Sequence, residues 1–285
     1  MSNANPIGRD PVACVTGWPV RHSRSPLIHR HWLKQYGIAG DYRIEEVAPE
    51  EFEDFLRNLS DRGYVGCNVT VPHKVSAARL VARCDETARA LGAVNTVWYE
   101  NGELVGANTD VYGFLANLDA DTPGWDDGLN RAVVLGAGGA ARGIVHALKS
   151  RGVSRIDVVN RTTERTAALI ADFGPVVAGH GWDEATTVLE DARLLVNTTS
   201  LGMQGSAPLE IDISPLSSEA VINDIVYVPL ETDLLKAAAA RGLKTTGGLG
   251  MLLHQAVPGF EKWFGVRPEV TDELRAILVA DVEGR

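Results

Sequence analysis

The chain has 285 residues, of which 45% are hydrophobic and 22% are charged, and its formal net charge is −10. This length and composition are typical of a globular protein with one large or two medium domains, and we favour two. The acidic balance disfavours nucleic acid or an anionic membrane as a partner, although it is compatible with a local basic pocket for a phosphorylated cofactor.

The sequence shows neither a long apolar run nor a signal peptide. The first residues, MSNANPIGRDP, have no basic and apolar regions of that kind, so we expect a cytoplasmic protein that does not contact a membrane. The three cysteines, Cys14, Cys67 and Cys84, are widely spaced and form no CxxC pair. This spacing predicts buried free thiols rather than a zinc site or a disulfide framework, and no metal is expected.

The first part of the chain predicts alternating strands and helices. Strands are expected at 12–16, 42–47 and 66–71, and helices from about residue 26 and over 49–59. This β-α-β-α-β order favours a largely parallel sheet covered by helices.

Two charged residues follow in this region. Pro72 is expected to open a helix that runs to Val81, which places Lys74 in its first turn. Asp110 begins a later helix, after strands at 93–99 and 104–107 that Asn101-Gly102 would join in a hairpin. Considered alone, Lys74 is expected to be a solvated surface group and Asp110 a helix cap.

From residue 131 the pattern restarts as a second α/β unit. The sequence RAVVLGAGGAARG, residues 131–143, predicts a buried strand, a glycine-rich turn and a helix. In a dinucleotide-binding turn, Gly136 supplies the bend, Gly138 lets backbone amides approach a pyrophosphate, and Ala141 permits close helix-to-sheet packing. An ordinary glycine-rich turn is the alternative.

Five more strands would complete a Rossmann domain. They are expected at 156–159, 176–178, 194–196, 221–226 and 243–246, with helices at 163–173 and 230–240. We place the domain boundary near residue 110, so that residues 1–110 form one domain and residues 111–250 the other. Two helices, at about 250–264 and 269–282, remain, and we expect residues 251–285 to pack back on the first domain.

The end of the second Rossmann strand selects the cofactor. Enzymes that use NAD carry an acid there, which binds the 2′-hydroxyl of the adenosine ribose. Here that position holds Asn160-Arg161-Thr162, and Asp157 lies inside the strand. A guanidinium group suits a 2′-phosphate, so Arg161, supported by Arg165, predicts NADP; two solvated arginines are the alternative.

Several ordered motifs resemble those of the shikimate dehydrogenase family over nearly the whole chain. They are HSRSP (22–26), NVTVPHK (68–74), GAVNT (92–96), NTD (108–110), GAGGA (136–140), NRT (160–162), and the segments 197–203, 224–229 and 248–255. The resemblance implies a two-domain α/β enzyme that reversibly reduces the ketone of 3-dehydroshikimate to shikimate with NADPH. That reaction belongs to the biosynthesis of chorismate and the aromatic amino acids.

The resemblance also assigns site residues by matching positions. Lys74 and Asp110 match the catalytic pair. The residues that would bind the substrate are Ser23, Ser25 and Tyr227 on the side of its carboxylate, and Thr70, Lys74, Asn95, Asp110 and Gln255 around its ring. The residues that would bind NADP are Gly136, Ala137, Gly138, Gly139, Ala140, Asn160, Arg161, Thr162, Arg165, Ile225, Gly248 and Met251, with Glu86 as a weaker candidate. His73 departs mildly from the family pattern, and a packing role is expected for it.

Three alternatives stay open. The nearest is a quinate/shikimate dehydrogenase that uses NAD, against which Arg161 argues. A protein like methylenetetrahydrofolate dehydrogenase would share the two-domain plan but not the loop 22–26. A non-catalytic NADPH sensor would have a degraded substrate site, whereas Lys74 and Asp110 are present. The expected partner is a small-molecule substrate, and the chain would be a monomer or a homodimer.

Overall fold

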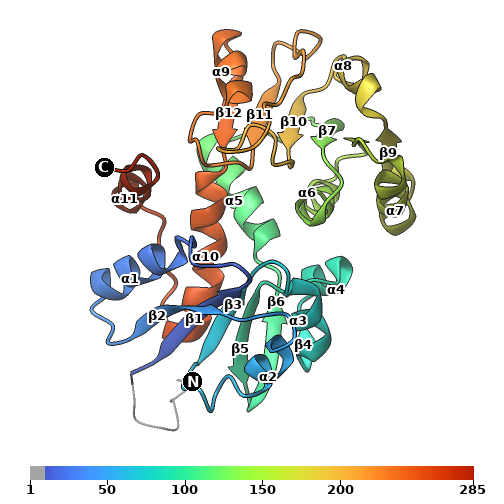
Figure 1. Cartoon of the computed structure of the whole chain (residues 1–285). Helices are drawn as coiled ribbons and strands as arrows, with labels where there is room; N and C mark the ends of the chain where they lie inside the picture. Colours follow the sequence, from blue (N-terminus) through green and yellow to red (C-terminus); the bar gives the residue numbers. More distant parts are fainter. Residues whose placement is uncertain (1–9) are drawn as a thin grey trace. The chain divides into compact units, whose positions relative to one another are not determined.

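The computed structural model describes residues 10–285, which form two compact units (Figure 1). The first unit runs to Asp110 and includes Leu253–Leu278, and the second comprises Val111–Leu252 and Val279–Arg285. Residues 1–9, and with them most of the stretch that predicts the absence of a signal peptide, lie outside the described part. No helix within residues 10–285 is long and apolar enough to cross a membrane.

The first unit has a mixed six-stranded sheet with the strand order β2-β1-β3-β5-β6-β4. Its strands are β1 (Val12–Gly17), β2 (Asp41–Glu46), β3 (Gly66–Val69), β4 (Arg83–Cys84), β5 (Thr96–Glu100) and β6 (Glu103–Ala107). Strand β1 is parallel to β2 and β3, while β5 is antiparallel to β3 and β6. The expected parallel arrangement therefore holds for β1, β2 and β3 and for the pair of β4 and β6, while β5 is antiparallel to both of its neighbours.

The predicted hairpin between β5 and β6 is confirmed. Asn101 and Gly102 have φ values of 54° and 82°. Positive φ at both central residues is the geometry that a two-residue hairpin turn requires. Because this turn is tight, β6 runs directly alongside β5, and its last residue, Ala107, pairs with the first residue of β5, Thr96.

Four helices accompany this sheet: α1 (Ser25–Gln35), α2 (Phe52–Arg57), α3 (Lys74–Leu80) and α4 (Glu86–Leu91). Helix α2 is shorter than the expected 49–59, since turns occupy the residues on both sides of it. Helix α4 and strand β4 are not predicted from the sequence, because they are too short to show a hydrophobic period. Cys14 and Cys67 are buried as expected, whereas Cys84 is half-buried, and all three thiols are free.

Most of the two C-terminal helices lies in the first unit, in residues 253–278, whereas residues 279–285 lie in the second unit, unlike the expected packing of all of residues 251–285 on the first. The helices are α10 (Leu249–Phe264) and α11 (Asp272–Val282), and α10 continues through Pro258. The indole Nε1 of Trp263 donates a hydrogen bond of 2.9 Å to the Val97 carbonyl. This approach requires glycine at position 66, since a Cβ there would lie 2.1 Å from the Trp263 Nε1 atom.

The second unit has a parallel six-stranded sheet with the order β12-β11-β10-β7-β8-β9. Its strands are β7 (Arg131–Leu135), β8 (Arg155–Val159), β9 (Val177–His180), β10 (Leu194–Asn197), β11 (Val221–Asp224) and β12 (Lys244–Gly247). Counted within this unit, the order is 6-5-4-1-2-3, which is that of the predicted Rossmann fold. The order reverses between β7 and β10, so the ligand crevice of such a sheet lies beyond the carboxyl ends of these two strands.

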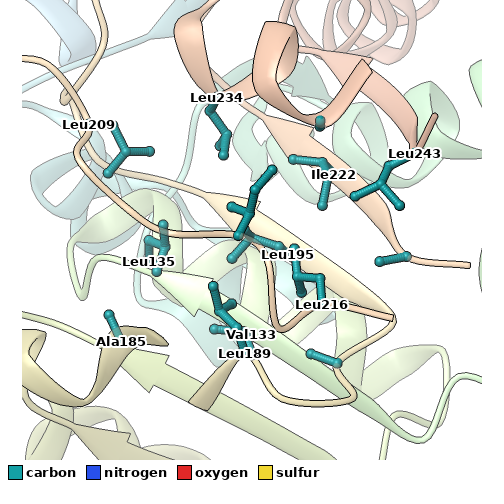
Figure 2. Close-up of a cluster of buried hydrophobic side chains, with 14 of the residues drawn as sticks. Val133, Leu135, Ala185, Leu189, Leu195, Leu209, Leu216, Ile222, Leu234 and Leu243 are labelled. Carbon is teal, nitrogen blue, oxygen red and sulfur yellow. The ribbon is translucent and has the colours of Figure 1, made fainter. Parts of the chain in front are cut away.

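Helices α5 (Asp110–Asp121), α6 (Gly139–Ser150), α7 (Thr163–Phe173), α8 (Ala185–Val188) and α9 (Asp233–Ala240) accompany these strands. Figure 2 shows part of the apolar core of this unit, in which Leu135, Leu195 and Ile222 come from adjacent strands. Each of these three side chains is fully buried. This core holds the glycine-rich turn at the end of β7 in a fixed place.

Candidate active site

Lys74 and Asp110 form an ion pair in the first unit. Lys74 is the first residue of α3 and Asp110 the first of α5, and the distance from Nζ to Oδ2 is 2.5 Å. The two side chains are 28% and 27% exposed, so the pair is half-buried but can be reached by a bound molecule. A lysine ammonium held in this way can exchange a proton with a substrate oxygen.

The two expectations for these residues considered alone were wrong. Lys74 is paired rather than solvated. The side chain of Asn108 accepts the hydrogen bond from the Asp110 backbone N–H, at 3.2 Å, so Asn108 supplies the capping oxygen there. The Asp110 carboxylate is thereby left to face Lys74.

The topology of the first unit brings most substrate candidates to one edge of its sheet. Ser23 and Ser25 follow β1, and Thr70 follows β3, which is parallel to β1. Asn95 precedes β5, which is antiparallel to β3, and Asp110 follows β6, which returns alongside β5. All these positions therefore come to the edge where β1 and β3 end.

The serines that would meet a carboxylate contact each other. The hydroxyl of Ser23 donates to that of Ser25 at 3.2 Å and accepts from the Ser25 backbone N–H at 3.3 Å. Thr70 is half-buried at the same edge. Gln255 is half-buried on the part of α10 that belongs to the first unit, and Tyr227 is half-buried in the second unit.

Buried polar side chains surround the Asp110 carboxylate. The Asn95 amide donates from Nδ2 to Asp110 Oδ1 at 2.9 Å and to Thr109 Oγ1 at 3.1 Å. Thr96 and Thr109 are buried, and their hydroxyl oxygens are 3.1 Å apart. Neither threonine has a predicted role, although a polar residue at the start of an apolar strand, as in β5, could have pointed to Thr96.

His73 has the expected packing role. Its ring is buried and stacks on Phe52 with a centroid distance of 4.2 Å. The Nε2 atom lies 2.7 Å from the Val47 carbonyl oxygen. Burial lowers the pKa of His73, against the opposing effect of that hydrogen bond, so the ring is neutral at physiological pH.

The glycine-rich turn has the geometry that a dinucleotide turn requires. Gly136 has a φ of 100°, and a Cβ there would lie 2.8 Å from Thr198 Oγ1. Ala141 is fully buried, as expected for close packing of α6 on the sheet. Residues 138–140, which span the start of the 12-residue helix α6, are exposed, so its free amides can be reached by an anion.

Two arginines stand at the position that selects the cofactor. Within residues 10–285 the side chains of Arg161 and Arg165 are exposed and have no hydrogen-bond or ion-pair partner. The Asn160 amide donates to the Thr162 carbonyl at 2.9 Å and shapes the turn before α7. Two uncommitted guanidinium groups can therefore bind a phosphate.

The nearby carboxylate of Asp157 is committed elsewhere. It is fully buried, and it accepts hydrogen bonds from Arg131 Nε at 2.7 Å and from Arg155 and lies 2.8 Å from His180 Nε2. Burial by itself would raise the pKa of Asp157, but the hydrogen bonds from Arg155, Arg131 and His180 outweigh it and lower the pKa. This acid is therefore not available to a ribose hydroxyl.

The remaining cofactor candidates lie in different parts of the chain. Gly248 is required by packing, since a Cβ there would lie 2.1 Å from the Ile225 carbonyl oxygen. Met251 is half-buried in the same unit, and Glu86 is exposed at the start of α4 in the first unit. Within residues 10–285 no group of three or more His, Cys, Asp or Glu residues could hold a metal ion.

A Rossmann sheet with this turn, together with a separate α/β unit that carries a lysine–aspartate pair, defines a dinucleotide-dependent oxidoreductase of two units. Three family models match the chain: the shikimate dehydrogenase substrate binding domain at residues 15–97, shikimate / quinate 5-dehydrogenase at 126–203, and the shikimate 5′-dehydrogenase C-terminal domain at 248–277.

Curated relatives match over the same length. Shikimate dehydrogenase (NADP(+)) of Brucella melitensis biotype 2 is 57% identical over 279 residues, which cover 97% of this chain and 96% of the relative. The enzyme of the same name from Azorhizobium caulinodans is 55% identical over 271 residues, 95% of this chain and 96% of the relative. The chain belongs to the shikimate dehydrogenase family.

Solved structures agree with this assignment. Shikimate 5-dehydrogenase from Thermus thermophilus, in complex with NADP(H) and shikimate, superposes with a TM-score of 0.81 at 34% identity over 95% of this chain and 99% of that chain. Quinate dehydrogenase from Corynebacterium glutamicum, in complex with NAD, superposes with a TM-score of 0.87 at 31% identity over 95% of this chain and 99% of that chain. The fold therefore accommodates both substrates and both cofactors among its members.

Proposed function

We propose that the chain catalyses the reversible reduction of 3-dehydroshikimate to shikimate with NADPH, in the biosynthesis of chorismate and the aromatic amino acids, and that Lys74 and Asp110 are its catalytic pair. The observation that carries the proposal is the ion pair itself. It is only partly exposed, and it lies at the edge of the sheet where the serine and threonine candidates for substrate binding gather.

The chemistry follows from the charges of the pair. When bound, NADPH supplies the hydride. Reduction of a ketone places negative charge on its oxygen, and the Lys74 ammonium donates a proton to that oxygen. In the reverse direction Lys74 accepts the proton of the hydroxyl. Asp110 holds the ammonium in position through its Oδ2 atom, which limits the geometries that Lys74 can take.

The first unit would bind the substrate. The hydroxyls of Ser23 and Ser25 would donate to its carboxylate. Thr70 and Gln255 would hold its ring hydroxyls beside Lys74 and Asp110, whereas Asn95, which is 3% exposed, would act through its hydrogen bond to Asp110. Neutral donors suit this task, since a carboxylate accepts hydrogen bonds from hydroxyl groups without needing a counterion.

The second unit would bind NADP. The start of α6, with residues 136–140, would take the pyrophosphate, since its free amides and dipole favour an anion. Arg161 and Arg165 would bind the 2′-phosphate. This assignment is supported by the fact that neither side chain has another partner in the described part of the chain. Ile225, Gly248 and Met251 would lie by the nicotinamide.

Loss of NADPH absorbance on addition of 3-dehydroshikimate tests the proposal. Lys74→Met is expected to lower kcat by at least about 100-fold with a much smaller effect on KM. The matched control is Lys236→Met. Lys236 is an exposed lysine of helix α9 in the second unit, and it also pairs with an aspartate, Asp233, at 3.3 Å. An unchanged kcat in Lys74→Met, or an equal loss in the control, would exclude the catalytic role.

The second candidate is oxidation of quinate with NAD, which the likeness to a quinate dehydrogenase favours. The same assay with quinate and NAD separates the two. If kcat/KM for quinate with NAD equals or exceeds the value for shikimate with NADP, the proposed function is wrong and the second candidate takes its place. The cytoplasmic location and the monomeric or dimeric state stay predictions.

A further inference from the structure

Two buried threonines near Asp110, Thr96 and Thr109, form a hydrogen-bond network with Asn95. Thr96 and Thr109 are 1% and 4% exposed, and Asn95 is 3% exposed. Both threonine hydroxyls lie within hydrogen-bond distance of the Asn95 Oδ1 atom, at 3.1 and 3.2 Å. Buried polar groups of this kind are stable only when their partners are all in place.

The backbone N–H of Thr109 identifies which end of the Asn95 amide is the oxygen. The Thr109 N–H donates to Asn95 Oδ1 at 2.7 Å. Because a backbone N–H can only donate, the atom facing it must be the amide oxygen. The Nδ2 end therefore faces Asp110 and donates to its Oδ1 atom, which leaves Oδ2 as the atom that meets Lys74.

The threonine hydroxyls hold this orientation from the other side. Tyr42 donates to Asn68 Oδ1 at 2.6 Å, and Asn68 Nδ2 donates to Thr96 Oγ1 at 3.1 Å. Since Thr96 accepts there, its own proton is directed to Thr109 or Asn95. Each hydrogen bond of this series is thus donated in the same direction, from Tyr42 in the core of the unit towards the carboxylate of Asp110.

We propose that Thr109, supported by Thr96, is a positioning residue for the reaction. Its hydroxyl accepts from Asn95 Nδ2 at 3.1 Å and donates to Asn95 Oδ1 at 3.2 Å, so it holds the Asn95 amide in place. The amide in turn orients the Asp110 carboxylate, with Oδ1 occupied and Oδ2 facing Lys74. Thr109 acts through Asn95 and does not touch the reacting atoms. The inference rests on the proposed function, because it takes Asp110 as a member of the catalytic pair.

Thr109→Val removes the hydroxyl at nearly constant volume and is the main test. It is expected to lower kcat by about 10- to 100-fold while KM changes by less than about threefold, since a misplaced catalytic group mainly costs turnover. Thr109→Ser keeps the hydroxyl and is expected to stay within about threefold of the wild type. The matched control is Thr122→Val, which breaks a buried hydrogen bond of 2.8 Å to Thr246 in the second unit and is expected to keep its kcat.

A double-mutant cycle separates positioning from general damage. In an Asp110→Asn background, Thr109→Val is expected to lower kcat by less than about twofold further, because the carboxylate that it orients is already absent. Full additivity, an unchanged kcat in Thr109→Val, or an equal loss in Thr122→Val would overturn the inference. If Thr109→Val does not fold, Thr96→Val enters the same cycle with the same criteria.

The NMR signals of the Asn95 side-chain amide provide a readout that needs no substrate. In the wild type both amide protons are hydrogen-bonded and are expected to exchange slowly, and Thr109→Val is expected to speed their exchange at least about tenfold. Unchanged exchange would overturn the inference even in an active enzyme. Faster exchange in a protein that does not reduce 3-dehydroshikimate would support the positioning contact and overturn the proposed function alone.

Discussion

His29 is a buried base in the aromatic core of the first unit. Its ring stacks on Tyr42 with a centroid distance of 4.0 Å and lies 5.7 Å from the ring of Trp32. It is fully buried, and neither ring nitrogen has a hydrogen-bond partner among residues 10–285. Burial lowers the pKa of His29 to about 3, despite the smaller opposing effect of the nearby Asn68 amide.

This lowered pKa makes the stability of the protein depend on pH. The unfolded chain binds a proton at His29 near pH 6.5, whereas the folded chain does so only near pH 3. The free energy of unfolding therefore has its full value from this group above pH 6.5, and it decreases as the pH falls towards 3. At about 1.36 kcal/mol per pH unit, the loss is about 2 kcal/mol at pH 5 and reaches about 4 kcal/mol at pH 3.

His29→Phe keeps the stacked ring and removes both nitrogens. We expect it to raise the free energy of unfolding at pH 7 by about 1 to 2 kcal/mol, because two buried polar atoms without partners disappear. Between pH 7 and pH 5 the wild type is expected to lose about 2 kcal/mol more than the variant. Urea unfolding followed by tryptophan fluorescence at both pH values measures this difference.

The control is His22→Phe, since His22 is exposed. This variant leaves His29 and its buried surroundings unchanged, so it is expected to keep the pH dependence of the wild type. Parallel pH dependences for His29→Phe and the wild type would refute the reasoning from burial.

Three further outcomes are expected. Gly248→Ala is expected to abolish NADPH-dependent turnover and to lower the melting temperature, since its Cβ would collide with the Ile225 carbonyl; a fully active, equally stable variant would contradict this close contact. Asp157→Asn is expected to lower the free energy of unfolding by about 3 kcal/mol at pH 7, because two arginines lose their buried counterion. This difference from the wild type is expected to shrink below about pH 4, where the lowered pKa of Asp157 no longer stabilises the fold. Urea unfolding at pH 7 and at pH 3 measures both values. Arg161→Glu with Arg165 intact is expected to raise KM for NADP at least about tenfold and to leave KM for NAD within about threefold, and an equal rise for both cofactors would argue against a 2′-phosphate contact.

The Rossmann unit could be predicted almost completely from the sequence. Strands β7, β10 and β11 are short apolar runs buried in a parallel sheet, so composition marks them, and Gly136 marks the turn at a position where the backbone has positive φ. Helix α7 has the predicted bounds, 163–173. In the first unit the short elements β4 and α4 could not be predicted, because two to six residues carry too few side chains to show a period.

The sequence by itself determined the turn, the choice of Arg161 over an acid, and the identities of Lys74 and Asp110, since each depends on residue type and on local conformation. Only the tertiary structure decided that Lys74 and Asp110 meet. They are 36 residues apart, and the antiparallel return through the Asn101-Gly102 hairpin brings the end of β6 to the edge where β3 ends. The direction of the Asn95 amide is likewise a tertiary property, because its partners come from both ends of that hairpin.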